Sequence, residues 1–361
     1  MARTWAPCAT TVASNGDVFA ALGRGPNGVL ALRDTNGDGI ADVQRRFGPA
    51  SGSGIALQGG YLYFAPNDRV LRWRWEEGQL EPAGEPEVIV RDLPIGGHGS
   101  KRIAVSADGR LYVTIGSGTN SCQVADRQRE SPGIDPCPEL ATRAGIWRFA
   151  AGRTGQTQQD GERVATGLRN PMALALQPGT GTVYAGVNGR DQPGDWGWSA
   201  EDNAEKPAEE FIRVEPGSDF GWPYCFYDPA ARKKLLNPEY GGDGRAVGRC
   251  ASKRTPEIGF PGHWAPLGVT FYSGTMFGDA YRGGAFIAFH GWWNRAPLPQ
   301  AGYRVVFVPF RNERITGEYR DFVTPAGNPT GIRPVGLAVG PDGSLYVGAD
   351  ANGKIWRIIR Q

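Results

Sequence analysis

The sequence predicts an all-β protein, a six-bladed β-propeller of four-stranded antiparallel blades. Two observations predict it: the composition, and a repeat that recurs six times. The 361 residues include 54 Gly, 28 Pro, 11 Trp and 12 Tyr. In such a mixture the aromatic residues pack strands, whereas Gly and Pro form tight turns. Six twisted sheets can close into a ring without exposed edges, so we expect residues 1–361 to form a single propeller domain.

Each repeat contains a Gly-bearing turn followed by a strand in which apolar and polar residues alternate. These turns and strands lie at 15–19, 59–63, 107–113, 179–184, 284–288 and 341–346. A further strand is expected in the last five repeats, at 70–73, 145–148, 210–213, 303–306 and 354–357. Long segments at 117–143 and 188–209 interrupt the spacing, which favours a propeller with elongated loops over a β-sandwich or an open solenoid.

The charge balance excludes several classes of partner. Charged residues make up 21% of the chain and nearly cancel, to a net charge of +2, so the sequence lacks the basic field that nucleic-acid binding requires. No apolar run approaches the roughly 20 residues that span a bilayer. We therefore expect neither a nucleic-acid partner nor a membrane span, and a small-molecule substrate fits better.

The cysteines indicate an oxidising compartment. Cys122 and Cys137 bracket one polar loop, Cys225 and Cys250 bracket another, and Cys8 belongs to neither. This arrangement predicts two loop-closing disulfides and a periplasmic or secreted protein whose leader is absent from this chain. The alternative is five reduced thiols in a cytosolic protein.

The three histidines differ in their surroundings. His98 lies between glycines just before an expected strand, where it could act as a general base at the mouth of the propeller or be an ordinary solvated loop residue. His263 and His290 have aromatic neighbours, so we expect them to pack among aromatic side chains.

Three arginines occupy equivalent positions in their repeats. Arg169, Arg295 and Arg333 each lie beside an expected strand, so closure of the ring would direct them toward one axis. Guanidinium groups bind carboxylates in pairs of hydrogen bonds. Their convergence would therefore indicate a polyanionic ligand, whereas isolated arginines would be surface charges.

One acidic loop follows the spacing of a calcium-binding loop. Its oxygen-bearing residues are Asp34, Asn36, Asp38 and Asp42, with glycine at the sixth position. The twelfth position is Arg45 where a bidentate Glu is usual. The loop is thus either a weak calcium site or an Asx-rich turn.

Four strings, read together, resemble the soluble dehydrogenases for glucose, aldoses and sorbosone that depend on pyrroloquinoline quinone (PQQ). They are HGSKR at 98–102, LRNP at 168–171, PGSDFGWP at 216–223 and FHGWWNR at 289–295. The resemblance covers roughly residues 50–361 in consistent order, and the last string is most similar to the sorbosone dehydrogenase-like branch.

The resemblance implies roles for particular residues. His98 would take the proton of a substrate hydroxyl while hydride passes to the quinone. The cofactor would be bound by Arg169, Asn170, Arg295 and Arg333. Calcium would be held by main-chain carbonyls at Gly189 and Arg190 and by the quinone itself. An acidic residue that assists the histidine in the glucose enzymes corresponds here to Ser117, which argues against glucose as the substrate.

These expectations define the predicted function. The chain would oxidise an aldose sugar or a sorbosone-like hydroxy-aldehyde with PQQ and Ca²⁺, and would pass electrons to an external acceptor. A calcium-dependent propeller lactonase and a propeller that only binds a partner are the alternatives.

Overall fold

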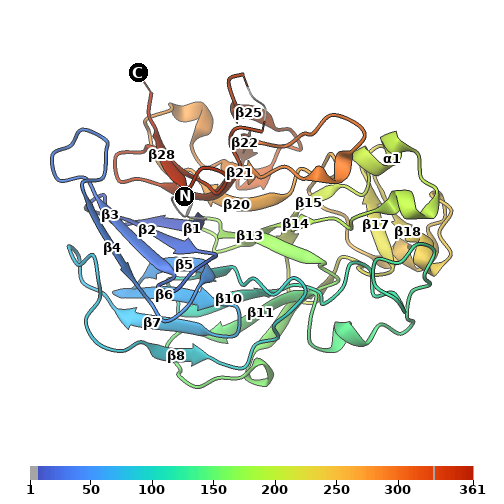
Figure 1. Ribbon diagram of the computed structural model, residues 1–361, viewed down its shortest axis with the longest axis horizontal. Helices are drawn as coiled ribbons and strands as arrows, with labels where there is room; N and C mark the ends of the chain where they lie inside the picture. Colours follow the sequence, from blue (N-terminus) through green and yellow to red (C-terminus); the bar gives the residue numbers. More distant parts are fainter. Residues whose placement is uncertain (1–6, 328–329, 361) are drawn as a thin grey trace.

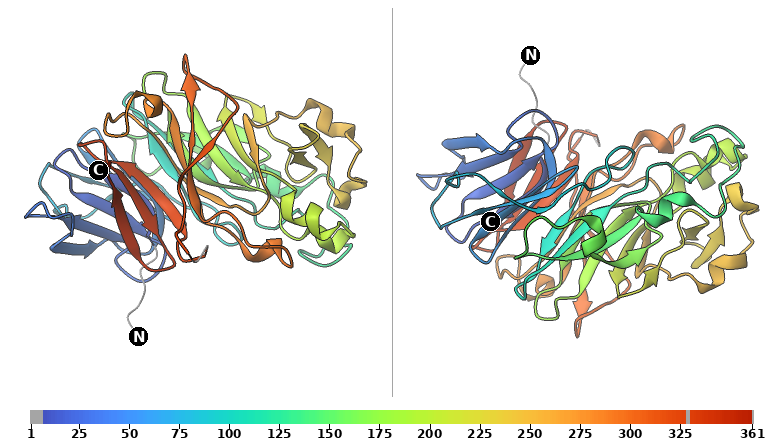
Figure 2. Two further views of the ribbon diagram at one scale, coloured as in Figure 1. Left: turned by 90° about the horizontal axis from the view of Figure 1, so that it is seen from above. Right: turned by 90° about the horizontal axis from the view of Figure 1, so that it is seen from below.

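The computed structural model describes residues 7–327 and 330–360, and these form six antiparallel sheets arranged around a central axis (Figures 1 and 2). The predicted all-β propeller is confirmed. Five sheets contain a core of four antiparallel strands, and the sixth contains three strands within the described residues.

The blades follow one another along the chain. The first contains β1 (Pro7–Val12), β2 (Val18–Leu22), β3 (Val29–Arg33) and β4 (Val43–Phe47). The second contains β5 (Gly52–Gln58), β6 (Tyr61–Pro66), β7 (Val70–Arg74) and β8 (Glu87–Val90). The third contains β9 (Ile103–Val105), β10 (Arg110–Ile115), β11 (Gly145–Ala150) and β12 (Glu162–Thr166), with the short parallel strand β16 (Ser218–Asp219) at its edge.

The remaining blades are interrupted by longer loops. The fourth contains β13 (Asn170–Leu176), β14 (Val183–Asn188), β15 (Glu209–Val214) and β19 (Ile258–Phe260). The fifth contains β20 (Pro266–Phe271), β21 (Ala285–Phe289), β22 (Arg304–Val308) and β25 (Arg320–Val323). The sixth contains β26 (Pro334–Val339), β27 (Leu345–Ala349) and β28 (Lys354–Ile358), and small hairpins are formed by β17 (Cys225–Asp228) with β18 (Lys233–Leu236) and β23 (Phe310–Arg311) with β24 (Arg314–Ile315).

The repeats predicted from the sequence correspond to the blades. Each of the six alternating segments overlaps the second strand of a blade, namely β2, β6, β10, β14, β21 and β27, and most of these strands extend beyond the predicted segment. The five further segments overlap the third strands β7, β11, β15, β22 and β28. The match follows from the turn before each second strand, where glycines such as Gly16, Gly60 and Gly109 have positive φ.

The ring closes through packing between neighbouring blades. The first strand of each blade lies innermost, and β1, β5, β9, β13, β20 and β26 each contact the next around the ring, with β26 returning to β1. A hydrophobic cluster fills each space between adjacent blades; Phe64, for example, packs between the first and second. The first and last blades meet through Ala20, Leu22, Leu30 and Ile355.

A lobe projects from the ring at one side (Figures 1 and 2). It contains the helix α1 (Ala200–Glu205) and the hairpin β17–β18, and it comes from the segment between β14 and β19. Cys225 and Cys250 form a disulfide in this lobe, and Cys122 and Cys137 form another in the loop after β10. Both predicted disulfides are confirmed, and Cys8 takes part in neither.

Candidate functional site

A cavity of about 340 Å³ opens where the inner strands begin and the second strands end. His98 precedes β9, Asn170 begins β13, and His263 precedes β20. Gly189 follows β14 and His290 follows β21. Because adjacent strands of a blade are antiparallel, these positions all fall at the same edge of the sheets. The fold thus brings residues from distant repeats to one cavity.

His98 is held through one ring nitrogen. Its Nδ1 lies 2.9 Å from Ser117 Oγ and 3.2 Å from the carbonyl oxygen of Ser117. A carbonyl can only accept, and the Ser117 hydroxyl donates to the carbonyl of Thr119 at 2.6 Å, so Nδ1 carries the hydrogen. Nε2 therefore carries the lone pair. Burial and the nearby Arg169 guanidinium lower the pKa of His98 to about 3, which keeps the ring neutral near pH 7.

Close backbone packing fixes the loop that carries His98. Gly97 has φ +56°, and a Cβ there would lie 2.2 Å from the carbonyl oxygen of Gly118. A Cβ on Gly116 would lie 2.6 Å from the His98 Cβ. Beneath the loop, the fully buried Lys101 donates from Nζ to the carbonyls of Pro94, at 2.9 Å, and Gly99. Burial lowers the pKa of Lys101 to about 7.

A network of hydrogen bonds and ion pairs centres on Asp191. Its carboxylate accepts from Arg169 Nη2 at 2.8 Å, from Arg127 Nη2 at 3.0 Å and from Asn294 Nδ2 at 3.2 Å. Its main-chain N–H donates to Asn120 Oδ1 at 2.9 Å. The two guanidinium groups hold the pKa of Asp191 well below its usual range, against the opposing effect of burial. Two cations and one anion thus lie together at the cavity wall.

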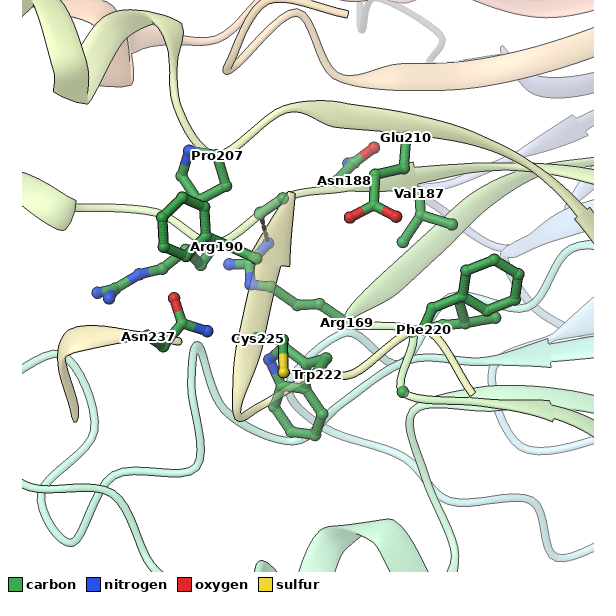
Figure 3. A pocket seen from close by; sticks show the side chains of 14 residues that line it. Arg169, Val187, Asn188, Arg190, Pro207, Glu210, Phe220, Trp222, Cys225 and Asn237 are labelled. Carbon is green, nitrogen blue, oxygen red and sulfur yellow. Dashed lines mark hydrogen bonds between the residues drawn. The ribbon is translucent and has the colours of Figure 1, made fainter. Parts of the chain in front are cut away.

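Arg169 lines the cavity as predicted, but most of its donors are already used. Its Nε donates to the carbonyl of Asn120 at 3.1 Å and its Nη1 to that of Gly189 at 2.7 Å. On its other side lies a smaller cavity that Asn188, Arg190 and Asn237 also line (Figure 3). Arg169 therefore ties together the loops after β10 and β14 while it faces the larger cavity.

A buried carboxyl group that was not predicted lies beside Gly189. Glu209 begins β15 and accepts a hydrogen bond from the Gly189 N–H at 3.0 Å. Burial raises the pKa of Glu209 to about 8. Asn188, which also lines the cavity, has a buried Oδ1 that accepts no hydrogen bond within the described chain. Two oxygen-bearing side chains at this wall are thus available to a cation.

The other two histidines also line the cavity, which differs from the packing role expected from their aromatic neighbours. His263 Nε2 donates to the carbonyl of Asn203 at 2.7 Å, which leaves its lone pair on Nδ1. His290 lies between two acceptors, the carbonyl of Gly291 at 2.9 Å and the Asp350 carboxylate at 3.0 Å. Both ring nitrogens of His290 are thus occupied by protein groups.

The structure does not bring two of the predicted arginines to the cavity in the way that the sequence suggested. The Arg295 guanidinium donates to the carbonyls of Ala204 and Gly262 and pairs with Glu205 at 2.5 Å. It therefore anchors α1 to the ring. The Arg333 guanidinium lies over the ring of Tyr303, 5.7 Å from its centroid.

The predicted metal residues fall in two separate places. The acidic loop from Asp34 to Asp42 connects β3 to β4 and is largely exposed, away from the cavity. The Asp34 carboxylate accepts from the N–H groups of Gly37 at 2.7 Å and Gly39 at 2.8 Å. Asn36 and Asp38 likewise accept main-chain N–H groups of the loop, an Asx-turn arrangement.

At the cavity itself, Gly189 lies on the wall, but the Arg190 side chain turns away and pairs with Glu239 at 2.6 Å. Among the described residues, no cluster of three or more His, Cys, Asp or Glu side chains forms a metal site. None of the helices in the described part combines the length and apolar character needed to cross a membrane.

Comparison with known proteins assigns the chain to a family. The family model described as TrAA12-like matches residues 21–361. Over 126 residues the chain is 32% identical to a pyrroloquinoline quinone-dependent pyranose dehydrogenase of Coprinopsis cinerea, a match that covers 29% of this chain and 16% of that enzyme. The matched segments cover no more than about half the length of the curated relatives.

Two solved structures share the fold over almost the whole chain. A calcium structure of the Trichoderma reesei member of carbohydrate-active enzyme family AA12 has a TM-score of 0.78 at 19% identity, covering 98% of this chain and 92% of that one. The holo form of the PQQ domain of the C. cinerea pyranose dehydrogenase has a TM-score of 0.76 at 20% identity, covering 100% and 94%. The resemblance predicted from the sequence is thereby confirmed at the level of the family.

Proposed function

The chain belongs to the TrAA12-like family, and on that premise we propose that it oxidises a sugar with PQQ and calcium. The substrate would be an aldose or a sorbosone-like hydroxy-aldehyde, and an external acceptor would take the electrons. The observation that carries the proposal is the cavity, in which a neutral histidine faces an arginine-bearing wall.

The cavity suits a planar, polyanionic cofactor. Its volume of about 340 Å³ lies within the range of small-molecule sites. Arg169 and Arg127 supply positive charge at one wall, and Asn170 adds an amide. The partly exposed Trp292 offers an aromatic side chain against which a flat ring can pack. Cofactor carboxylates would share the two guanidinium groups with Asp191.

The oxygen atoms near Gly189 suit calcium. Ca²⁺ prefers carboxylate, amide and main-chain carbonyl oxygens, and Glu209, Asn188 and Gly189 provide one of each along this wall. A bound cation would lower the pKa of Glu209, because it would favour the carboxylate that burial alone disfavours. We propose these three residues as the protein's part of the calcium site, with Arg190 contributing at most its main chain.

The residues of the chain perform a limited set of tasks. His98 accepts the hydroxyl proton of the sugar at Nε2, since Ser117 holds Nδ1 in its protonated form. Asp191 keeps Arg169 and Arg127 oriented, and the close packing at Gly97 and Gly116 holds His98 in place. When bound, the quinone supplies the hydride acceptor.

Reconstitution with PQQ and Ca²⁺ tests the proposal. Stopped-flow reduction of the reconstituted protein by a panel of aldoses and hydroxy-aldehydes should show quinone bleaching, and His98→Gln should slow it by about 10²–10⁴-fold with PQQ affinity retained. His263→Gln is the matched control, because His263 is the other histidine with a lone pair toward the cavity. If His263→Gln loses the reaction and His98→Gln does not, the base is His263. No spectral change on adding PQQ and Ca²⁺ would rule out the cofactor.

The two disulfides support a proposal about the compartment. Two disulfides persist in oxidising surroundings, so we propose a periplasmic or secreted protein. Thiol counting in denaturant, before and after reduction of protein isolated from its native cells, would test this. Five reactive thiols before reduction would contradict export.

A further inference from the structure

Asn120 joins several loops beside the candidate site. It lies in the long loop between β10 and β11, and it is 1% exposed. Its main-chain N–H donates to Asp126 Oδ1 at 2.9 Å. Its carbonyl accepts from Arg169 Nε at 3.1 Å and from Trp222 Nε1 at 2.9 Å. The main chain at Asn120 is therefore held from both sides by loops of other repeats.

The side chain of Asn120 pairs with the main chain of Asp191. Its Oδ1 accepts from the Asp191 N–H at 2.9 Å, and its Nδ2 donates to the Asp191 carbonyl at 3.0 Å. The reverse orientation of the amide would place donor against donor and acceptor against acceptor, so these two contacts fix it. A carboxamide offers a donor and an acceptor side by side at neutral pH, which a carboxylate does not. The position of the Asp191 main chain thus depends on the residue type at 120.

The next residue along the chain makes a parallel connection. Ser121 Oγ donates to Glu239 Oε1 at 2.8 Å, and the Glu239 carboxylate pairs with Arg190 at 2.6 Å. All three residues are buried. Two adjacent residues of one loop, 120 and 121, therefore hold two adjacent residues of another, 190 and 191.

Arg169 extends these contacts to the wall that we propose for calcium. The guanidinium that donates to the Asn120 carbonyl also donates to the carbonyl of Gly189 at 2.7 Å and to the carboxylate of Asp191 at 2.8 Å. The Gly189 N–H in turn donates to Glu209 at 3.0 Å. A displacement of Asp191 would therefore be transmitted to Gly189 and Glu209, two of the three proposed calcium residues.

We propose that Asn120 is a positioning residue for the calcium site, an inference that rests on the proposed function. It lies outside the set of described residues that line the cavity, so it acts through Asp191 and Arg169 and touches neither the metal nor the substrate. It holds residues 189–191 in the conformation that binds calcium. Groups that orient metal ligands in this way change metal affinity by about 10–100-fold when they are removed.

Calcium titration of the full chain, followed by calorimetry in the presence of PQQ, measures this role without reference to turnover. Asn120→Ala removes both hydrogen bonds to Asp191 and should weaken calcium binding by about 10–100-fold. Trp222→Phe is the matched control, because it removes a donor to the Asn120 carbonyl but leaves the pairing with Asp191 intact. It should lower the stability of the fold and leave calcium affinity unchanged. Unchanged affinity in Asn120→Ala, or an equal loss in both variants, would overturn the proposal.

Asn120→Asp provides a second test that keeps the volume of the side chain, and it carries the test if Asn120→Ala does not fold. The ionised carboxyl group has no donor for the Asp191 carbonyl, whereas the protonated group has one. Compared with the wild type at the same pH, this variant should therefore lose calcium affinity at high pH and regain it as the pH is lowered. A loss that does not change with pH, or no loss at any pH, would contradict the positioning role.

The wild type separates this inference from the proposed function. If the wild-type chain binds calcium and PQQ but the variants at position 120 behave like it, only the role of Asn120 fails. A wild-type chain that binds neither calcium nor PQQ would overturn the proposed function, and the role of Asn120 with it.

Discussion

At the scale of single residues, similar side chains differ in function because their loops differ. His98, His263 and His290 all line the cavity, yet His98 and His263 each use one ring nitrogen in hydrogen bonds, whereas both ring nitrogens of His290 face protein groups. Arg169 faces the cavity, whereas Arg295 is used to anchor α1. The position of each residue within its repeat indicated the edge of the ring at which it lies, but it did not indicate the direction of the side chain.

The protonation of His98 gives a prediction for the cofactor-free protein. Its pKa is lowered to about 3, so its ring signal should not titrate between pH 8 and 5. The chain has three histidines, so NMR of the imidazole protons, assigned with His98→Gln, can follow each one. A normal titration of His98 near pH 6.5 would contradict the neutral ring.

The same shift predicts how stability depends on pH. Between pH 6.5 and about 3 the unfolded chain binds a proton at His98 that the folded chain does not, so stability falls as the pH decreases through this window. Because His98→Gln removes this linkage, the variant should lose less stability than the wild type between pH 7 and 4.5. Urea unfolding at the two pH values measures the difference, and equal losses would contradict the predicted shift.

At the scale of elements, strands were predictable and the loops that build the site were only partly so. Alternating strands after Gly turns, such as β6 and β10, have a local signal. Glu209 and Asp191 have none: their roles depend on burial and on Arg169 and Arg127, which come from other loops. The sequence offered one indication of them, namely that both carboxylates lie near the ends of the long segment 188–209 that interrupts the repeat.

The link between Arg295 and α1 predicts a change in stability rather than in binding. Arg295→Ala leaves the carbonyls of Ala204 and Gly262 without a donor, so we expect it to destabilise the fold by about 2–4 kcal/mol with PQQ affinity largely retained. Arg169→Ala should instead weaken PQQ binding by about 1.5–3 kcal/mol. PQQ titration in calcium buffer and urea unfolding of both variants measure the two effects. Loss of PQQ affinity in Arg295→Ala would instead support the cofactor-binding role that its position in the repeat predicted.

The loop that carries His98 depends on Lys101. Lys101→Met keeps the apolar stem but removes the donor to the carbonyls of Pro94 and Gly99, which should cost about 1–3 kcal/mol. Hydrogen exchange should therefore accelerate at residues 94–99 and remain unchanged in β26. The exposed Lys354 provides the control, since Lys354→Met should alter neither. Unchanged exchange at residues 94–99 would show that the loop does not need this support.

At the scale of the whole molecule, ring closure makes each blade depend on two neighbours. Hydrophobic clusters lie at all six junctions, including that between the first and last blades. The six repeats were readable because the turn chemistry recurs, whereas the lobe with α1 and β17–β18 has no repeat to reveal it. Closure also explains why residues as distant as His98 and Asp350 line one cavity.

Closure leads to the proposal that residues 1–361 unfold as one domain. Leu30 is 5% exposed and packs at the junction of the first and last blades. Leu30→Ala should therefore lower the free energy of unfolding by about 2–4 kcal/mol. The unfolding midpoints measured by tryptophan fluorescence and by far-ultraviolet circular dichroism should fall equally, because a domain that unfolds cooperatively has a single transition. Ile40→Ala, at a side chain that is 71% exposed, is the matched control and should leave both midpoints unchanged. Two separated transitions in the wild type, or a shift of only one probe in Leu30→Ala, would mean that the blades unfold in independent groups and that the first and last blades do not close the ring cooperatively.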